Sequence, residues 1–373
     1  DPGNRDMWLI KLGLSDLTDS DGDSLYDVWE TDGIDYDFDG TVDLNLTEAN
    51  SLHKDIYLEI DYMDSTGTSH DHRPDDSAIS SVVNAFANAP VSNPDGVDGI
   101  ELHIEVDDQF THKSVISAWV AFDQFKESLF GTATQRSSSN NVTVLAAKRL
   151  AYRYCLFIHQ YSIWSGTQWV TTTSSGIAEL PGNDFIVSLG AFTNSTGNSR
   201  EQAGTLMHEL GHTLGLRHGG EDDINGKPNY LSVMSYTFQL DRWLTGLLDY
   251  SREVLPSLDE HNLKEPLGIQ GPSDGRTVWG DLTCSVPGIY AVSTQGPIDW
   301  NVDNDTIDTG VVRSVNDFGP PTNGYGDGLQ TTLKGYNDWA NLKYNFRLTS
   351  EFSDGVHLNI ESNELTSEID QEM

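Results

Sequence analysis

The sequence contains very little cysteine, few basic residues and no long apolar run. Cys155 and Cys284 are its only cysteines, which excludes a disulfide-stabilised scaffold. They can form one bridge, but Cys155 lies in an apolar, strand-like run where a buried free thiol is expected as readily. No apolar stretch reaches the roughly 18 residues that cross a bilayer. We therefore expect a soluble chain without a membrane span.

The first residue, Asp1, does not look like a translation start, and no secretion signal precedes it. Such signals are removed from mature secreted proteins. We therefore expect a secreted, extracellular protein from which a leader or pro-segment has been removed. No residue indicates how latency would be maintained.

Basic residues are the second shortage, with 21 Lys and Arg against 58 Asp and Glu and a net charge of -37. This balance argues against binding to nucleic acid or to an anionic membrane surface. Two explanations of the acidity stay open, namely calcium-binding carboxylates and a surface suited to a salty environment. The crowding of Asp near the N-terminus favours calcium for part of the charge. The length of 373 residues is sufficient for an enlarged or two-lobed domain.

The stretch HELGHTLGLRH, residues 208–218, carries the strongest chemical signal. His208 and His212 are four apart, so a helix places both imidazoles on one face. Gly215 can take a positive φ and turn the chain so that His218 reaches the same ion. Three imidazoles with an open fourth position are typical of catalytic zinc. Glu209, between the first two ligands, is the candidate general base.

This helix has a start signal and an apolar stripe. Ser199 and Gln202 have the spacing of a capping box, and apolar residues follow at helical intervals. Gly204 and Gly211 weaken a helix, so we expect each to lie where a neighbouring element packs closely.

The pattern HExxHxxGxxH resembles the zinc signature of the metzincin clan of metallopeptidases. Residues 232–236, SVMSY, resemble the Met-turn that follows it in that clan. The resemblance implies that the three histidines bind zinc, that Glu209 is the base and that Met234 forms the hydrophobic floor of the site. It also implies that Tyr236 assists the metal or the oxyanion. The family within the clan stays unassigned.

Three acidic loops are candidates for structural calcium, with a solvated acidic face as the alternative for the first two. The first, residues 19–30, has the ligand spacing of an EF-hand loop, but Ser24 replaces the usual sixth-position Gly. The second has Gly40 but Leu46 at its twelfth position. The candidate ligands are Asp19, Asp21, Asp23, the Leu25 carbonyl, Asp27 and Glu30; Asp35, Asp37, Asp39 and Asp43; and Asp299, Asn301, Asp303 and Asp305.

Periodicity predicts an α/β (α+β) fold of metzincin type, with a mixed twisted sheet, packed helices and the zinc helix at the floor of a cleft. Strands are expected at residues 53–63, 100–106, 152–160 and 185–189, and helices at 75–89 and 119–130. Residues 176–184 look like an exposed connection near the sheet edge that pairs with an extended substrate in metzincins. Short helices are expected at 248–260 and 336–346 in a lower, irregular lobe.

We divide the chain into a calcium-binding-like segment (1–52), an upper catalytic subdomain (53–218), a lower subdomain (219–348) and an acidic tail (349–373). The acids of residues 219–230 indicate a solvated loop rather than a calcium or supporting site. We assign no metal to the remaining histidines. His70 and His72 flank Asp71 in a polar loop and offer an alternative as ligands of a second ion, but an exposed or hydrogen-bonded role is favoured. The remaining set is His53, His70, His72, His103, His112, His159 and His261.

The sequence therefore predicts a monomeric zinc endopeptidase that cleaves a protein or peptide substrate. Two alternatives stay open. One is a calcium-loaded adhesion or surface module with a non-catalytic metzincin fold, and the other is a zinc hydrolase of a non-peptide amide.

Overall fold

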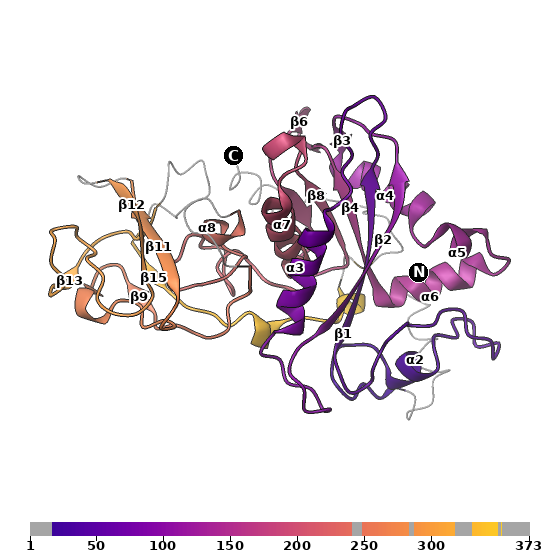
Figure 1. The fold of residues 1–373 in the computed structure, drawn as a ribbon, viewed down its shortest axis with the longest axis horizontal. Coiled ribbons are helices and arrows are strands. Elements are labelled where there is room, and N and C mark those ends of the chain that lie inside the picture. The colour runs from indigo at the N-terminus through magenta and orange to yellow at the C-terminus, as the bar shows by residue number, and fades with distance from the viewer. Residues whose placement is uncertain (1–16, 241–247, 283–286, 318–329, 350–351, 353–373) are drawn as a thin grey trace.

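A computed structural model describes residues 17–240, 248–282, 287–317, 330–349 and 352 of the chain. The part that we call upper contains a five-stranded sheet in the order β2-β1-β4-β8-β7 and lies at the right of Figure 1. The lower lobe, with β9 to β15, lies at the left. All neighbouring pairs of the five-stranded sheet are parallel except β7–β8, which is antiparallel at one edge. The predicted mixed α/β sheet is therefore confirmed. Its strands are β1 (Asp55–Met63), β2 (Glu101–Phe110), β4 (Tyr152–Ile158), β7 (Gly176–Ala178) and β8 (Asp184–Ser188).

The interior strand β1 is buried on both faces, although apolar and polar residues alternate along it. Glu59 and Asp61 are both inaccessible to solvent. Lys148 Nζ lies 2.6 Å from the Glu59 carboxylate, and the Tyr154 hydroxyl donates to Asp61 at 2.5 Å. Because buried charges need such partners, the polar positions of β1 face a second core rather than water.

Helices cover both faces of this sheet. The strand side chains Ile56, Leu58 and Ile60 pack with α3 and α7, while α4 packs with the opposite face. Helix α6 packs against the N-terminal segment, where Ala147 and Ala151 contact its buried apolar residues. The helices are α2 (Asp27–Thr31), α3 (Asp76–Ala87), α4 (Ala118–Leu129), α5 (Ala133–Ser137), α6 (Asn141–Ala151), α7 (Ser199–Thr213) and α8 (Tyr236–Gln239), with a 3-10 turn at Thr193–Ser195.

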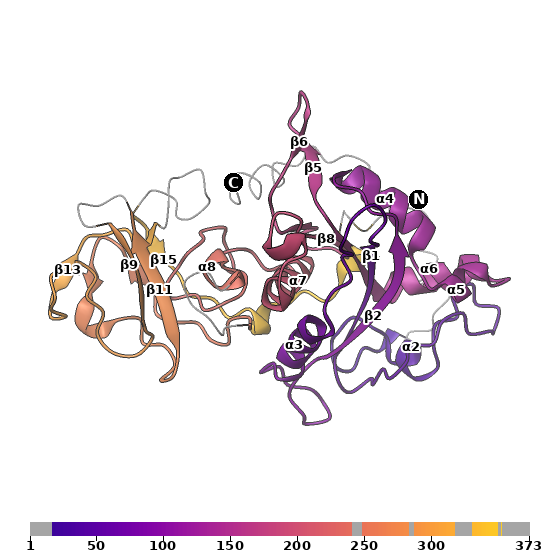
Figure 2. The ribbon, with the colours of Figure 1, turned by 45° about the horizontal axis from the view of Figure 1, so that its top comes forward.

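A small sheet in the order β3-β5-β6 projects from the upper part, as Figure 2 shows. It comprises β3 (Ile116–Ser117), β5 (Tyr161–Trp164) and β6 (Trp169–Thr171). Among the described residues, no helix is long and apolar enough to cross a membrane.

The lower lobe has more regular structure than the sequence indicates. Trp279, Trp300 and Ile298 contribute to a core of its own. The predicted helix at 248–260 is wrong: Tyr250 instead donates to the Met207 carbonyl at 2.6 Å, and Pro256 cannot continue a helix. The strands are β9 (Leu258–Asp259), β10 (Leu263–Lys264), β11 (Arg276–Asp281), β12 (Gly288–Ser293), β13 (Thr309–Val311), β14 (Asn316–Asp317) and β15 (Thr332–Leu333), with a 3-10 turn at Glu265–Leu267.

The segment 336–349 returns from the lower lobe to the upper part, where it appears in yellow in Figure 1. The predicted helix over 336–346 is wrong, because only the 3-10 turns Trp339–Asn341 and Phe346–Leu348 form. The Trp339 ring packs on Phe86 and Tyr250, so this segment packs the lower lobe against α3 of the upper part. Cys284 and nearly all of the expected acidic tail, 349–373, lie outside the described residues. Cys155 is a buried free thiol.

Candidate metal centre

Helix α7 begins one residue earlier than the predicted capping box implies. Asn198 is the N-cap, and its side chain accepts from the backbone N–H groups of Arg200 and Glu201 while Glu201 reciprocates. The predicted cap residues tie the helix to a neighbouring segment instead. Ser199 Oγ donates to the Asp75 carboxylate at 2.6 Å, and the Asp75 N–H donates to the Gln202 side chain at 2.7 Å.

The imidazoles of His208 and His212 are both oriented by backbone carbonyls. His208 Nδ1 lies 3.0 Å from the Val233 oxygen, and His212 Nδ1 lies 2.8 Å from the Leu216 oxygen. An Nδ1 that donates to a carbonyl leaves the ring's lone pair on Nε2. The two Nε2 atoms are 3.1 Å apart, so both lone pairs face one point.

The third imidazole reaches this point through the predicted turn. Gly215 has φ 85°, a conformation that costs a side chain with Cβ about 1–2 kcal/mol. The His218 ring centroid lies 5.2 Å from that of His208 and 4.9 Å from that of His212. One ligand nitrogen from each of the three histidines lies within 4.8 Å of the others.

The donor set fits zinc. All three rings are buried, and burial lowers the pKa of His212 to about 4 and that of His208 well below its usual value. Neutral imidazole is the form that binds metal. Zinc–nitrogen bonds of about 2.0–2.1 Å in a tetrahedron place neighbouring nitrogens about 3.3 Å apart, close to the separation of the two Nε2 atoms.

Glu209 lies beside the edge strand β7. A Cβ added to Gly176 would lie 2.5 Å from Glu209 Oε1, so the carboxylate packs directly on the strand backbone. The interpretation of residues 176–184 as an exposed connection is wrong, because Gly176, Ile177, Glu179 and Asn183 are buried and the first two belong to β7. The expected edge strand does lie in this neighbourhood.

Met234 is buried beneath the helix. A Cβ on Gly211 would lie 2.4 Å from Met234 Sδ, and one on Gly204 would lie 2.0 Å from the Gln239 carbonyl. Both helix glycines therefore lie at close approaches, as predicted. The Met-turn is held by a residue that sequence reasoning missed: the Asp338 carboxylate accepts from Tyr230 Oη at 2.8 Å and from Ser232 Oγ.

Tyr236 packs against the third histidine. Its ring centroid lies 4.6 Å from that of His218 and 5.7 Å from that of His208. The backbone N–H of Tyr236 donates to Asn225 Oδ1 at 3.0 Å, a positioning contact that the sequence did not reveal. The acids of the same loop are partly paired with bases: Lys227 Nζ lies 2.7 Å from Asp222 and Arg217 lies 2.8 Å from Asp223.

Among solved structures, the chain is similar to archaemetzincin from Methanopyrus kandleri at 16% identity. The match covers 54% of this chain and 90% of that one, with a TM-score of 0.27. No family model and no curated protein matches the chain. A likeness this distant carries no argument about function. Any proposal of function therefore depends on the geometry of the three-histidine centre.

The three candidate calcium loops share one backbone conformation. In each, the fourth and sixth residues have positive φ: Gly22 and Ser24, Phe38 and Gly40, and Val302 and Asn304. In each, the sixth N–H donates to the first carboxylate, at 3.0, 2.9 and 2.9 Å. Ser24 therefore makes the turn for which the sequence offers no Gly.

The first loop places buried carboxylates together. Asp19, Asp21 and Asp23 form one group, and Asp23 forms another with Glu30 and with Asp55 of β1. Within the described part of the chain, both Glu30 oxygens and Asp21 Oδ2 are buried without a hydrogen-bond partner. Burial raises the pKa of Asp21 to about 6, that of Asp23 to about 8 and that of Glu30 to about 9.

Other predicted ligands have different partners. Asp27 accepts from Ser20 N and Oγ, and Asp43 accepts from Thr143 Oγ1 and the Tyr36 N–H. Leu25, whose carbonyl is the candidate ligand, donates its N–H to Asp23 at 2.7 Å. In the second loop Asp35, Asp37 and Asp39 lie together. In the third, Asp299 and Asn301 accept from loop N–H groups, and so do Asp303 and Asp305.

Four histidines that the sequence assigned to no site lie together, namely His70, His72, His112 and His159. The only sequence signal was the spacing of His70 and His72. Three others are bonded to acids instead: His53 to Asp95, His103 to Asp55 and His261 to Asp259.

Proposed function

We propose that the chain is a zinc endopeptidase of metzincin type that acts on protein or peptide substrates as a secreted monomer. The observation that carries the proposal is the convergence of three buried imidazoles, two of them oriented by backbone carbonyls, beside Glu209 and the sheet edge. Bound zinc supplies a Lewis acid that lowers the pKa of water and polarises a carbonyl.

Each residue then has a defined part in peptide cleavage. His208, His212 and His218 would hold the ion, and the carbonyl contacts would keep the first two in the tautomer with its proton on Nδ1. Glu209 removes the proton from the attacking water and delivers it to the leaving amine. The Tyr236 phenol stabilises the oxyanion, a contribution of about 3 kcal/mol for a single donor. An extended substrate pairs with β7, the edge strand of the described sheet.

We further propose that calcium binds the three acidic loops as a structural ion. The first loop gives the strongest support, because Glu30 and Asp21 bring buried carboxylate oxygens that lack a partner in the described structure. Asp55 adds a carboxylate that the loop sequence does not contain. A divalent cation among these groups removes their mutual repulsion.

The test is a digestion assay on casein and a peptide mixture, before and after removal of transition metals with a zinc-selective chelator. We expect cleavage to stop on chelation and to return with added zinc. Cleavage that persists without zinc would contradict the proposal. Hydrolysis of cell-wall fragments with intact peptides would instead support a non-peptide amidase, and no hydrolysis by the zinc-loaded protein would support an adhesion module.

A further inference from the structure

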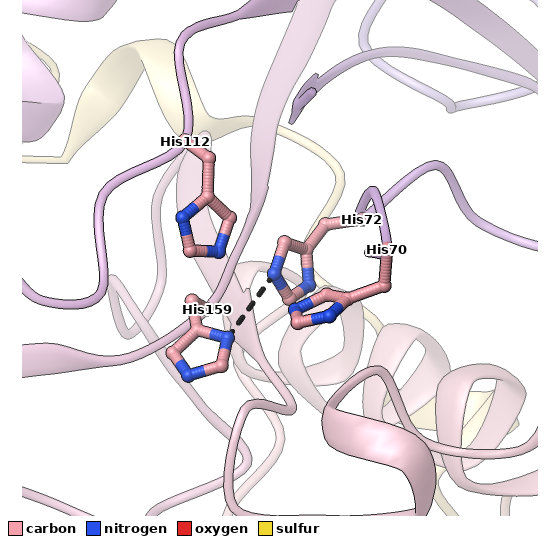
Figure 3. Close-up of side chains that lie close together, drawn as sticks. All are labelled: His70, His72, His112 and His159. Atoms are coloured by element: carbon pink, nitrogen blue, oxygen red, sulfur yellow. Dashed lines mark hydrogen bonds between the residues drawn. The ribbon is translucent and has the colours of Figure 1, made fainter. Parts of the chain in front are cut away.

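A cluster of four imidazoles lies at the carboxyl ends of three parallel strands, as Figure 3 shows. We call the set the four-histidine cluster. Two members follow β1, one follows β2 and one directly follows β4. Because the carboxyl ends of parallel strands meet at one edge of a sheet, segments far apart in sequence converge there. The members are His70, His72, His112 and His159.

The four rings form a nearly regular tetrahedron. All six distances between ring centroids lie between 5.1 and 5.5 Å. The centre of such a tetrahedron is about 3.1–3.4 Å from each centroid. A zinc–nitrogen bond of about 2.0–2.1 Å places zinc about 3.2 Å from an imidazole centroid. The rings therefore stand at the distance that a shared tetrahedral ion requires.

The nitrogen atoms agree with this arrangement. His72 Nε2 lies 3.3 Å from His159 Nδ1, the separation of about 3.3 Å expected between two ligands of tetrahedral zinc. In the described structure, His70 Nε2 and His112 Nε2 are buried without a hydrogen-bond partner. Such orphaned polar atoms are rare in folded proteins, and an ion at the centre would satisfy both.

The backbone around the cluster is fixed independently of any ion. The His72 N–H donates to the Met63 carbonyl at 2.8 Å, and the Gly190 N–H donates to the His159 carbonyl at 2.6 Å. The His112 N–H donates to the Asp64 carboxylate at 3.0 Å. A Cβ on Gly190 would lie 2.7 Å from His159 Cδ2. The rings thus hold their positions because the strand ends are bonded to their neighbours.

We propose that the four-histidine cluster is a second zinc site, closed by four protein ligands and therefore structural. Closed tetrahedral sites are typical of structural zinc, whereas an open position marks a catalytic one. Copper(II) and nickel(II) also accept imidazole, but they favour square-planar or tetragonal arrangements, which the tetrahedral rings do not match.

The site would link three strand ends to the helix of the metal centre. The segment that carries His70 and His72 continues to Asp75, which is bonded to Ser199 and Gln202 of α7. An ion in the cluster would therefore stabilise the position of α7 without contacting substrate.

The test uses the full chain, loaded with zinc, desalted and analysed for metal content by mass spectrometry. We compare the wild type, His70→Gln/His112→Gln, His208→Gln/His212→Gln and the combined variant. The control is His53→Gln/His261→Gln, which removes two histidines outside both sites. We expect two zinc equivalents in the wild type and the control, one in each double variant and none in the combined variant.

A thermal readout separates this site from the catalytic one. In His208→Gln/His212→Gln, added zinc should still raise the melting temperature, and the combined variant should lose that rise. Equal zinc content in His70→Gln/His112→Gln and the control would overturn the second site, whatever happens at the first. If the wild type binds one zinc ion, and His70→Gln/His112→Gln binds none while His208→Gln/His212→Gln keeps it, the four-histidine site would stand and the proposed catalytic site would be contradicted.

Cobalt substitution covers the case in which a variant fails to fold. Cobalt(II) in His208→Gln/His212→Gln should give the intense visible absorption of a tetrahedral four-nitrogen site. An octahedral, weakly absorbing spectrum, or stoichiometric binding of copper but not of zinc or cobalt, would overturn the assignment.

Discussion

The backbone of Gly176 contacts the Glu209 carboxylate so closely that a hydrogen atom fits between them but a methyl group does not. A Cβ there would lie 2.5 Å from Oε1 and 2.6 Å from Cδ. The residue expected to move the proton is therefore positioned by the edge strand β7, the element on which we expect the substrate to lie. Under the proposed function, this contact would position both the base and the extended substrate.

Gly176→Ala should lower peptide hydrolysis by about 100-fold, because a displacement of about 1 Å costs that much in catalysis. Zinc content should stay unchanged, since no ligand moves. The measurement is turnover of a fluorogenic peptide together with metal analysis. The control is Gly96→Ala, where an added Cβ meets no atom within 4 Å and the φ of 82° adds only backbone strain, about 1–2 kcal/mol. Equal activity of the two variants would show that the contact is not restrictive.

Glu209→Gln should reduce hydrolysis by about 10²–10⁴-fold, the range for loss of general acid–base catalysis. Zinc should remain bound because the three histidines and their carbonyl partners are untouched. Glu127→Gln, on the exposed face of α4, is the matched control. Substantial turnover by Glu209→Gln would refute its role as base.

The first acidic loop should make stability depend on both calcium and pH. Burial raises the pKa values of Asp21, Asp23 and Glu30 to about 6, 8 and 9, above unfolded values of about 4. The calcium-free folded state therefore binds more protons than the unfolded state. The stability contributed by these groups is complete below about pH 4 and is lost as the pH rises to about 9.

Saturating calcium replaces those protons, so the melting temperature should fall much less steeply with pH than it does in chelator. At a hundredfold excess over its dissociation constant, calcium adds about 2.7 kcal/mol. Thermal unfolding across this pH range, with and without calcium, measures the difference. Glu30→Gln should flatten the calcium-free slope. Superimposable curves with and without calcium would contradict a site in this loop.

Lys148→Met should lower the free energy of unfolding by about 3–5 kcal/mol, because it leaves Glu59 as an uncompensated buried charge. Lys334→Met removes an exposed pair with Glu221 and should cost about 0–1 kcal/mol. Urea denaturation compares the two variants. Adding Glu59→Gln to Lys148→Met should recover part of the loss, and equal costs for the two lysines would show that burial does not matter here.

The metal centre could be predicted because its determinants are local. His208 and His212 share a helix turn, and Gly215 supplies the bend to His218, so one continuous segment encodes the geometry. The capping box was misplaced because neighbouring polar residues compete for the cap; Asn198 took it and Ser199 bonded to Asp75. Ser24 takes the positive φ for which a Gly was expected, and its N–H donates to Asp19 of the same loop.

The four-histidine cluster could not be predicted because its members lie in three segments that only the sheet topology brings together. His72 and His159 are separated in sequence by three strands and four helices, yet their nitrogens are 3.3 Å apart. The burial of both faces of β1 could likewise not be predicted from its alternating pattern. Lys148 and Tyr154, which contact the buried acids of this strand, belong to α6 and β4.

The returning segment 336–349 contacts several elements elsewhere in the molecule, among them the end of α7. The Lys343 N–H donates to the Leu214 carbonyl at 2.8 Å, directly after α7, and Asp338 holds the Met-turn. Arg347 donates to the Leu150 carbonyl and to that of Ser24 in the first acidic loop. A nascent polypeptide lacks these supports until synthesis has passed residue 347. The three-histidine centre would therefore be completed late, and the proposed peptidase activity would appear only after most of the chain has been synthesised.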